Sequence, residues 1–174
     1  TDPTQPIRYW RWPYWDKEGL YFNSVTPIMD KSYAKARLYY DKYKNSLYSY
    51  DDATYSTMNK KSSFMSDYDD HTYGGSLEVG TSLVPRNLIK LAGHYKVDVH
   101  KEHNVPNPYQ TFEDRIFSIG AEDTLTITSR LYAILGLSYD SLETVQAQNF
   151  NSTTGQLSDF PKYSTDAWNP QGGL

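Results

Sequence analysis

The chain of 174 residues contains no cysteine, so it can form neither a disulfide framework nor a thiolate zinc site. Long apolar runs are also missing, because no stretch approaches the roughly 18 consecutive apolar residues of a transmembrane helix. Positive charge is scarce as well: 17 Lys and Arg stand against 21 Asp and Glu, which gives a net charge of −4. The chain therefore lacks the basic surface of a nucleic-acid-binding protein, and we expect no nucleic-acid partner.

Catalytic motifs are absent in the same way. The sequence holds no G-x-S-x-G, no P-loop and no H-E-x-x-H. The adjacent carboxylates Glu113 and Asp114 would point to opposite faces of a strand, so they do not form a general acid–base pair. We expect no enzymatic activity, no catalytic residue and no cofactor.

Aromatic residues are abundant. They make up 16% of the chain, with 17 Tyr and 4 Trp, although hydrophobic residues reach only 38% and the mean hydropathy is −0.72. Tyr and Trp combine an apolar ring with a polar tip, which suits membrane–water interfaces and also surfaces that bind sugars or peptides. Composition alone leaves both possibilities open.

Strict alternation of apolar and polar residues runs through much of the chain. In segment 71–84, Tyr73, Leu77 and Val79 alternate with Ser76 and Glu78. Such alternation predicts a strand with one apolar and one polar face. The same pattern predicts strands at about 18–26, 32–44, 87–100, 111–128 and 130–142. Most of these exceed the usual 5–6 residues and suit the roughly 9–11 residues of a tilted membrane strand.

The connections between these strands alternate in length. Short turns are expected at 27–31, 84–87 and 128–130, and long polar loops at 45–70, 100–110 and 143–165. Long strands with dyad alternation and this loop pattern are typical of an all-β, antiparallel up-and-down transmembrane β-barrel. Residues 1–174 would form one partial barrel domain of about six strands, with the start of a seventh at 167–174.

Several short motifs point to a family. They are Phe-Glu-Asp-Arg at 112–115, Ser-Ile-Gly-Ala-Glu-Asp-Thr at 118–124, Arg-Leu at 130–131 leading to Gly-Leu-Ser-Tyr-Asp at 136–140, and Ala-Trp-Asn-Pro-Gln-Gly-Gly-Leu at 167–174. Together they resemble TonB-dependent outer-membrane receptors of the siderophore-receptor type. The last motif is similar to the family's Asn-Pro-x-x-Gly strand entry. The resemblance covers residues 71–174 and is only general in character before them.

The resemblance implies a bacterial outer-membrane protein with a 22-stranded barrel and a plugged lumen. It also implies import of a scarce ligand such as a ferric siderophore, with outer-membrane lipid, that ligand and TonB as partners. TonB would act through a plug region, and the plug domain is absent from this chain. We therefore expect the chain to be a segment of a longer protein that forms part of the barrel wall and the extracellular ligand-binding loops.

Candidate ligand-binding residues come from the aromatic cluster at residues 9–15 and from later tyrosines, which would stack on a ligand if they lay at the outer mouth. The alternative is an aromatic girdle or packing between strands. His94 faces the lumen by parity. The candidates are Trp10, Trp12, Tyr14, Trp15, Tyr48, Tyr50 and His94.

No metal site is predicted. His100 and His103 have the spacing of one helical face but are expected in a solvated loop. The acidic residues near 51–52 and 67–70 match no calcium-loop pattern.

Two other functions stay open. A soluble carbohydrate-binding β-sandwich would use the Tyr and Trp rings as stacking platforms, but its strands would be shorter and its apolar faces would pack together. A passive outer-membrane porin would share the barrel and lack the plug.

Overall fold

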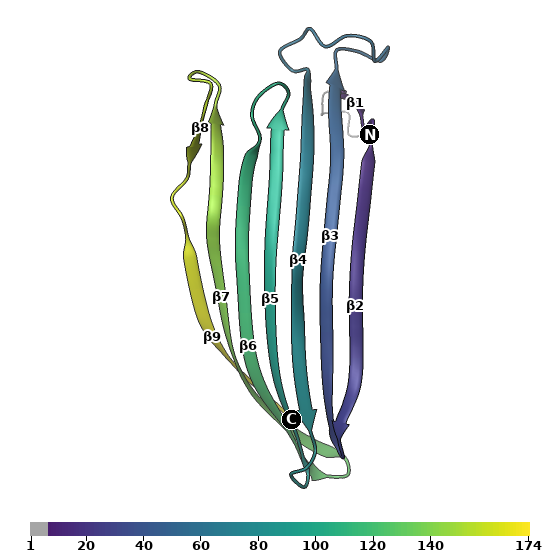
Figure 1. Ribbon diagram of the computed structural model, residues 1–174, viewed down its shortest axis with the longest axis vertical. Coiled ribbons are helices and arrows are strands. Elements are labelled where there is room, and N and C mark those ends of the chain that lie inside the picture. The colour runs from purple at the N-terminus through teal and green to yellow at the C-terminus, as the bar shows by residue number, and fades with distance from the viewer. Residues whose placement is uncertain (1–6) are drawn as a thin grey trace.

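The computed structural model describes residues 7–174, which fold into a nine-stranded antiparallel sheet (Figure 1). The strands are β1 (Tyr9–Arg11), β2 (Trp15–Met29), β3 (Ser32–Tyr50), β4 (Phe64–Thr81), β5 (Asn87–Asn104), β6 (Gln110–Thr128), β7 (Leu131–Asn151), β8 (Gln156–Asp159) and β9 (Ser164–Gly173). The predicted all-β, antiparallel up-and-down arrangement is confirmed. Among the described residues, no helix is long and apolar enough to cross a bilayer.

Strand order follows the sequence, from β3 through β4, β5 and β6 to β7. At one edge, β1 and β2 both pair with β3, and at the other edge β8 and β9 both pair with β7. Each of these two pairs acts as one interrupted strand. Pro161 lies in the second interruption, where its missing N–H costs no ladder hydrogen bond.

At the long-loop end the strands are longer, and the connections shorter, than the sequence predicted, whereas β4 ends at Thr81 and the turn expected at 84–87 covers residues 82–86. The expected loop 45–70 is wrong in extent, since β3 continues to Tyr50 and β4 begins at Phe64. The expected loop 100–110 shrinks to residues 105–109. In the expected loop 143–165, β7 continues to Asn151 and β8 follows. These extensions carry mostly polar residues on both faces, so they lack the regular alternation that could mark them as strands.

The first hairpin also differs from its prediction. The strand expected at 18–26 extends from Trp15 to Met29, and the turn expected at 27–31 is only Asp30–Lys31. Lys31 has a φ of 57°, the left-handed conformation that tight turns use. Pro27 lies inside β2 beside a register shift between Pro27 and Met29. An edge strand tolerates such a proline.

Register separates the sheet into an apolar face and a polar face. One row of cross-strand partners on the apolar face is Ala36, Leu77, Gly93, Ile119, Tyr139 and Trp168. The neighbouring row on the polar face is Arg37, Ser76, His94, Ser118 and Asp140. Most large apolar side chains stay open on the apolar face; Leu77 and Leu135 are 54% and 70% exposed. Within residues 7–174 no second sheet covers this face, so these residues do not build the β-sandwich alternative.

The polar face is held by cross-strand charge pairs. Lys35 Nζ lies 3.0 Å from Glu78 Oε1, and Lys90 Nζ lies 2.8 Å from Glu122 Oε1. Tyr33 donates a 2.7 Å hydrogen bond to the same Glu78 oxygen. Opposite charges directly across a strand pair stabilise its register.

The apolar face forms a band with a sharp upper limit. Toward the long loops it ends in a line of aromatic side chains: Tyr40, Tyr73, Tyr95, Phe117, Tyr139 and Trp168. Charged residues follow beyond that line on several strands, among them Lys42, Arg115 and Glu143, whereas β5 continues with the buried Val97 and Val99. In β4 the band runs from Tyr73 to Thr81, which fits the roughly 9–11 residues that a tilted membrane strand needs.

Candidate functional site

Two adjoining depressions lie where β1, β3 and β4 reach the long loops. The first has a volume of about 370 Å³ and the second about 340 Å³. Arg8, Trp10 and Phe64 line both of them. Because they share these three side chains, we treat the two depressions as one candidate site and call it the mouth site.

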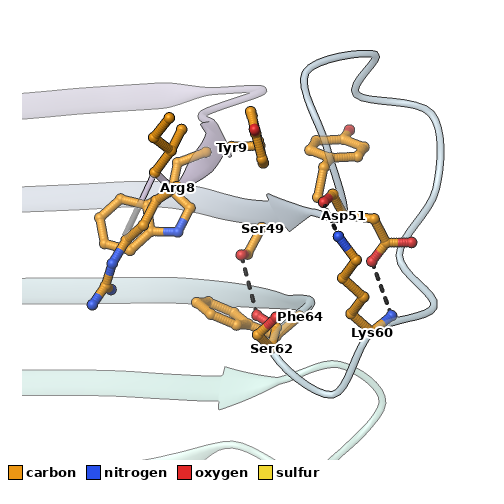
Figure 2. A pocket seen from close by; sticks show the side chains of 10 residues that line it. Arg8, Tyr9, Ser49, Asp51, Lys60, Ser62 and Phe64 are labelled. Atoms are coloured by element: carbon orange, nitrogen blue, oxygen red, sulfur yellow. Dashed lines mark hydrogen bonds between the residues drawn. The ribbon is translucent and has the colours of Figure 1, made fainter. Parts of the chain in front are cut away.

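Strand β1 places Arg8 and Trp10, and Phe64 begins β4 opposite Ser49 of β3. Trp10 pairs with Ser49 in register, which puts it on the polar face, and its neighbour Tyr9 pairs with Tyr50 on the opposite face. The guanidinium carbon of Arg8 lies 4.9 Å from the centre of a Trp10 ring. This is a cation–π contact, and it holds a positive charge beside an aromatic surface. Figure 2 shows Arg8, Ser49 and Phe64 around the first depression.

A clamp around Asp51 fixes the loop 51–63 beside the site. The Asp51 carboxylate, 8% exposed, accepts hydrogen bonds from the backbone N–H groups of Asn59 (2.7 Å) and Lys60 (2.9 Å) and from the hydroxyl of Ser63 (2.5 Å). These donors, led by Asn59, hold the pKa of Asp51 well below its usual range. Lys60 Nζ also donates to the Asp51 carbonyl at 2.6 Å (Figure 2), which keeps the lysine at the edge of the first depression.

The second depression adds side chains from β5 and β6. Tyr68 and Glu102 are register partners there, and Gln110 lies at the start of β6. Gln110 Oε1 accepts a 2.7 Å hydrogen bond from the backbone N–H of Phe150, so its orientation is fixed. The mouth site thus combines aromatic surfaces with the positive charges of Arg8 and Lys60. It can stack on a flat ligand and contact an anionic group.

The structure brings together two of the seven residues predicted to bind ligand, since Trp10 and Tyr50 both line the first depression. Trp12 lies next to the site, with its ring centre 6.0 Å from the rings of both Trp10 and Trp15. Trp15 is 63% exposed and packs against Tyr43.

The other predicted residues lie elsewhere. The Tyr14 carbonyl accepts a 3.3 Å hydrogen bond from the N–H of Ser46. Tyr48 packs 6.3 Å from Tyr50 and pairs with Arg11 on the face opposite Trp10. His94 faces the polar side, 3.3 Å from the Tyr39 hydroxyl, but its partner Ser76 is separated from Ser66 of the mouth site by roughly 33 Å along β4.

Sequence reasoning missed Arg8, Lys60 and Phe64. Phe64 was assigned to a loop because the stretch 45–70 is mostly polar, although the adjacent apolar residues Phe64 and Met65 are a usable signal there. The expectation that His100 and His103 lie in a solvated loop is also wrong, because both belong to β5. His100 contacts Asp70 at 2.8 Å, and among residues 7–174 no group of three or more His, Cys, Asp or Glu is arranged to hold a metal.

Comparison with solved structures shows that this chain is similar to β-barrel proteins, of which two are described here. The structure described as "Copper transporter OprC" superposes with a TM-score of 0.72 at 15% identity, covering 95% of this chain and 28% of that one. BauA, the ferric preacinetobactin receptor from Acinetobacter baumannii, matches with a TM-score of 0.62 at 12% identity, covering 90% of this chain and 27% of the other. No family model matches the chain, and no curated protein matches its sequence.

These matches define the fold. The sheet has the fold of part of a β-barrel wall, and the chain spans little more than a quarter of each matched protein. The resemblance to TonB-dependent outer-membrane receptors that the motifs predicted is confirmed at the level of the fold.

Proposed function

We propose that these residues form part of the barrel wall and outer mouth of a TonB-dependent receptor in the bacterial outer membrane, which imports a scarce ligand such as a ferric siderophore. One observation carries the proposal. A single sheet has an apolar band closed by aromatic residues on one face, and a polar face with a built depression at its long-loop end. Receptors of this class need both features.

The apolar band supports contact with lipid. Its side chains are exposed, and in water so large an apolar surface would cause aggregation. In a bilayer the same surface meets hydrocarbon, while Tyr and Trp rings such as those of Tyr139 and Trp168, 5.2 Å apart, lie at the interface. Lipid is therefore the partner of this face.

The mouth site supports a ligand that is flat and negatively charged. Trp10, Phe64 and Tyr68 offer ring surfaces, and Arg8 and Lys60 offer positive charge. Cation–π and aromatic contacts contribute about 0.5–2 kcal/mol each. An iron chelate with aromatic, anionic groups has this chemistry. The carboxylates of Asp51 and Glu102 also line the site, so the anionic groups of such a ligand would lie toward Arg8 and Lys60.

Transport requires parts beyond these residues. β2 and β9 are the open edges of the sheet and must pair with further strands for a barrel to close. A plug domain would then fill the lumen against the polar face, and TonB would supply energy through it. The described residues contribute the wall and the ligand contacts, and they have no catalytic role.

Ligand titration of the full-length receptor in detergent tests the proposal. The probes are the ferric complexes of a tris-catecholate and of a tris-hydroxamate, and the readout is quenching of tryptophan fluorescence. Trp10→Ala is expected to weaken binding of the catecholate complex about tenfold or more, a loss of about 1.4 kcal/mol or more, and Trp10→Phe to restore most of it. Trp168→Ala, on the apolar face, is the matched control. If neither complex binds saturably, the proposal is contradicted and a passive porin is favoured.

A further inference from the structure

A histidine at the upper end of β5 ties one loop of the mouth site to the sheet. The loop 105–109 joins β5 to β6 at the long-loop end (Figure 1). His103 and Asn104 precede this loop and Gln110 follows it, and all three residues line the second depression of the mouth site. The position of the loop therefore sets one wall of that depression.

The hydrogen bond that His103 makes to this loop decides which ring nitrogen carries a proton. Nδ1 lies 2.6 Å from the backbone oxygen of Asn107. A carbonyl oxygen only accepts, so Nδ1 donates, and Nε2 of the neutral ring is a bare acceptor. Nε2 is buried and has no hydrogen-bond partner among residues 7–174, which the structure describes. A buried acceptor without a donor is costly, so the neutral ring is unfavourable here.

A carboxylate faces this bare nitrogen. Asp67 is the register partner of His103 on β4, and its Oδ2 lies 3.4 Å from Nε2. The Ser46 hydroxyl donates to the other Asp67 oxygen and so orients the carboxylate. With a neutral ring two acceptors face each other and repel, whereas with a protonated ring the same contact is an ion pair. The two side chains are only 13% and 22% exposed, so solvent screens this contact weakly.

Tyr109, at the end of the loop, also favours the protonated ring. Its ring stacks on that of His103 with centres 3.8 Å apart and an angle of 21° between the planes. The face of an aromatic ring attracts a cation. Burial, and then the charge of Asp67, raise the pKa of the Tyr109 hydroxyl above its usual value near 10, so Tyr109 stays uncharged at neutral pH.

The other charged groups around His103 change this balance little. Asp69, on the same face of β4, is paired with Lys44 at 2.9 Å. Lys101 lies two residues before His103 on the same face of β5, at a rise of about 7 Å, so it opposes protonation less than Asp67 favours it. Glu102 faces the polar side of the sheet, where it lies 3.5 Å from His100.

We propose, on the basis of the function proposed above, that His103 is a pH-sensitive positioning residue of the mouth site. When its ring is protonated, Asp67 holds the ring and the ring holds the Asn107 carbonyl, so the loop 105–109 closes the wall of the second depression. When the ring loses its proton, Nε2 and Asp67 repel each other, the ring turns away and the loop opens. Histidine changes charge between about pH 5 and pH 8, so ligand binding weakens as the pH rises through that range.

Asp67→Asn separates this account from a merely structural role of His103. The amide keeps an oxygen for the Ser46 hydroxyl and presents an N–H to the bare Nε2 of the neutral ring. The variant should therefore keep the loop closed at high pH, where the wild type opens it. Asp69→Asn is the matched control, because it removes the same charge two residues along the same face but breaks a contact with Lys44 instead. It should behave like the wild type.

Hydrogen exchange of the full-length protein in detergent, read by mass spectrometry and corrected for intrinsic rates, measures the loop directly. Peptides covering residues 104–110 report it, since the N–H groups of Val105 and Asn107 donate to the Met65 and Asn104 oxygens. Between about pH 5.5 and pH 8 their protection in the wild type is expected to fall about tenfold. In Asp67→Asn it should not fall, and peptides from 73–79 should stay protected in both proteins.

Ligand binding tests the link between this loop and the mouth site. At pH 8, Asp67→Asn is expected to bind the ferric tris-catecholate complex about fivefold more tightly than the wild type. Comparing the two proteins at one pH cancels any effect of pH on the complex itself. Equal affinities would overturn the link between His103 and the mouth site.

Two exchange results would overturn the pH-sensitive loop and leave the proposed receptor function intact. One is equal protection of residues 104–110 at both pH values in the wild type, which decides the matter even if the variant does not fold. The other is the same loss of protection in Asp67→Asn as in the wild type. If the loop responds as expected but neither ferric complex binds at either pH, the receptor function fails and the pH-sensitive loop stands.

Discussion

Tyr33 and Gly80 are register partners on the polar face of β3 and β4, and the Tyr33 ring occupies the space that a Cβ on Gly80 would fill. The Tyr33 hydroxyl donates to Glu78, which is also paired with Lys35. A glycine inside a strand lacks a side chain to pack. Here the ring across the ladder supplies that packing, so the glycine and the tyrosine act as one unit.

Gly80→Ala is expected to destabilise the full-length protein by about 1–3 kcal/mol, because the added methyl group pushes the Tyr33 ring off Glu78. The temperature at which the folded protein converts to the slower or faster unfolded band in gel electrophoresis measures this loss of stability. Gly93→Ala is the control, since its Cβ has room. When Tyr33 is also replaced by Leu, the stability lost through Gly80→Ala should be much smaller. If the stability losses of the two substitutions simply add, the two residues act independently.

Replacement of Asp51 by Asn should release the loop 51–63. The amide keeps one oxygen, but it loses the charge that draws in the donors of Asn59, Lys60 and Ser63. Limited proteolysis should cut the variant within 51–63 much faster than the wild type. Asp159→Asn, at the far edge of the sheet, is the matched control. Equal cleavage of variant and wild type would mean that other contacts hold the loop.

The same clamp predicts a pH profile. The folded pKa of Asp51 is lowered, so its stabilising effect is fully present above the usual carboxyl pKa near 3.8 and disappears only as pH falls through the lower folded value. Hydrogen exchange in 51–63 of the wild type, corrected for intrinsic rates, should therefore stay constant from pH 7 down to pH 4. Opening of the loop between those values would contradict the clamp.

Leu77→Arg should prevent normal membrane assembly. Leu77 lies in the middle of the apolar band of β4, where an arginine facing hydrocarbon costs about 2–4 kcal/mol. Gln171→Arg on the polar face is the control and should be nearly neutral. Folding yield into lipid vesicles measures both. An equal yield for the two variants would place Leu77 away from lipid.

Alternation predicted the part of the sheet where one face is apolar. Tyr73, Leu77 and Val79 share a side because neighbouring strand residues point in opposite directions, and that is visible from sequence alone. Mostly polar residues occupy both faces in the segments Lys42–Tyr50 and Phe64–Asp70. Their pairing therefore follows from the register of the alternating parts of β3 and β4, which lie closer to the short turns. The sequence therefore predicted where the long strands lie, but not how far they extend toward the long loops.

The mouth site was only partly predictable. Trp10 and Tyr50 stood out by residue type. Arg8 reaches the site only because β1 pairs beside the upper end of β3, and β1 is three residues long with no alternation to mark it. Phe64 reaches the site because β4 begins opposite Ser49, in a stretch that also lacks alternation. The Asp51 clamp joins residues 8 to 12 positions apart through loop geometry that no short motif encodes.

Contact between the apolar face and lipid is tested most directly by scanning β4 with single cysteines, since these 174 residues contain none. Positions 72–79 of the full-length protein are labelled with a fluorophore and exposed in vesicles to brominated lipid. Strong quenching is predicted at Tyr73, Leu77 and Val79, and weak quenching at Thr72, Ser76 and Glu78. Uniformly weak quenching at all six positions would contradict a lipid-facing sheet.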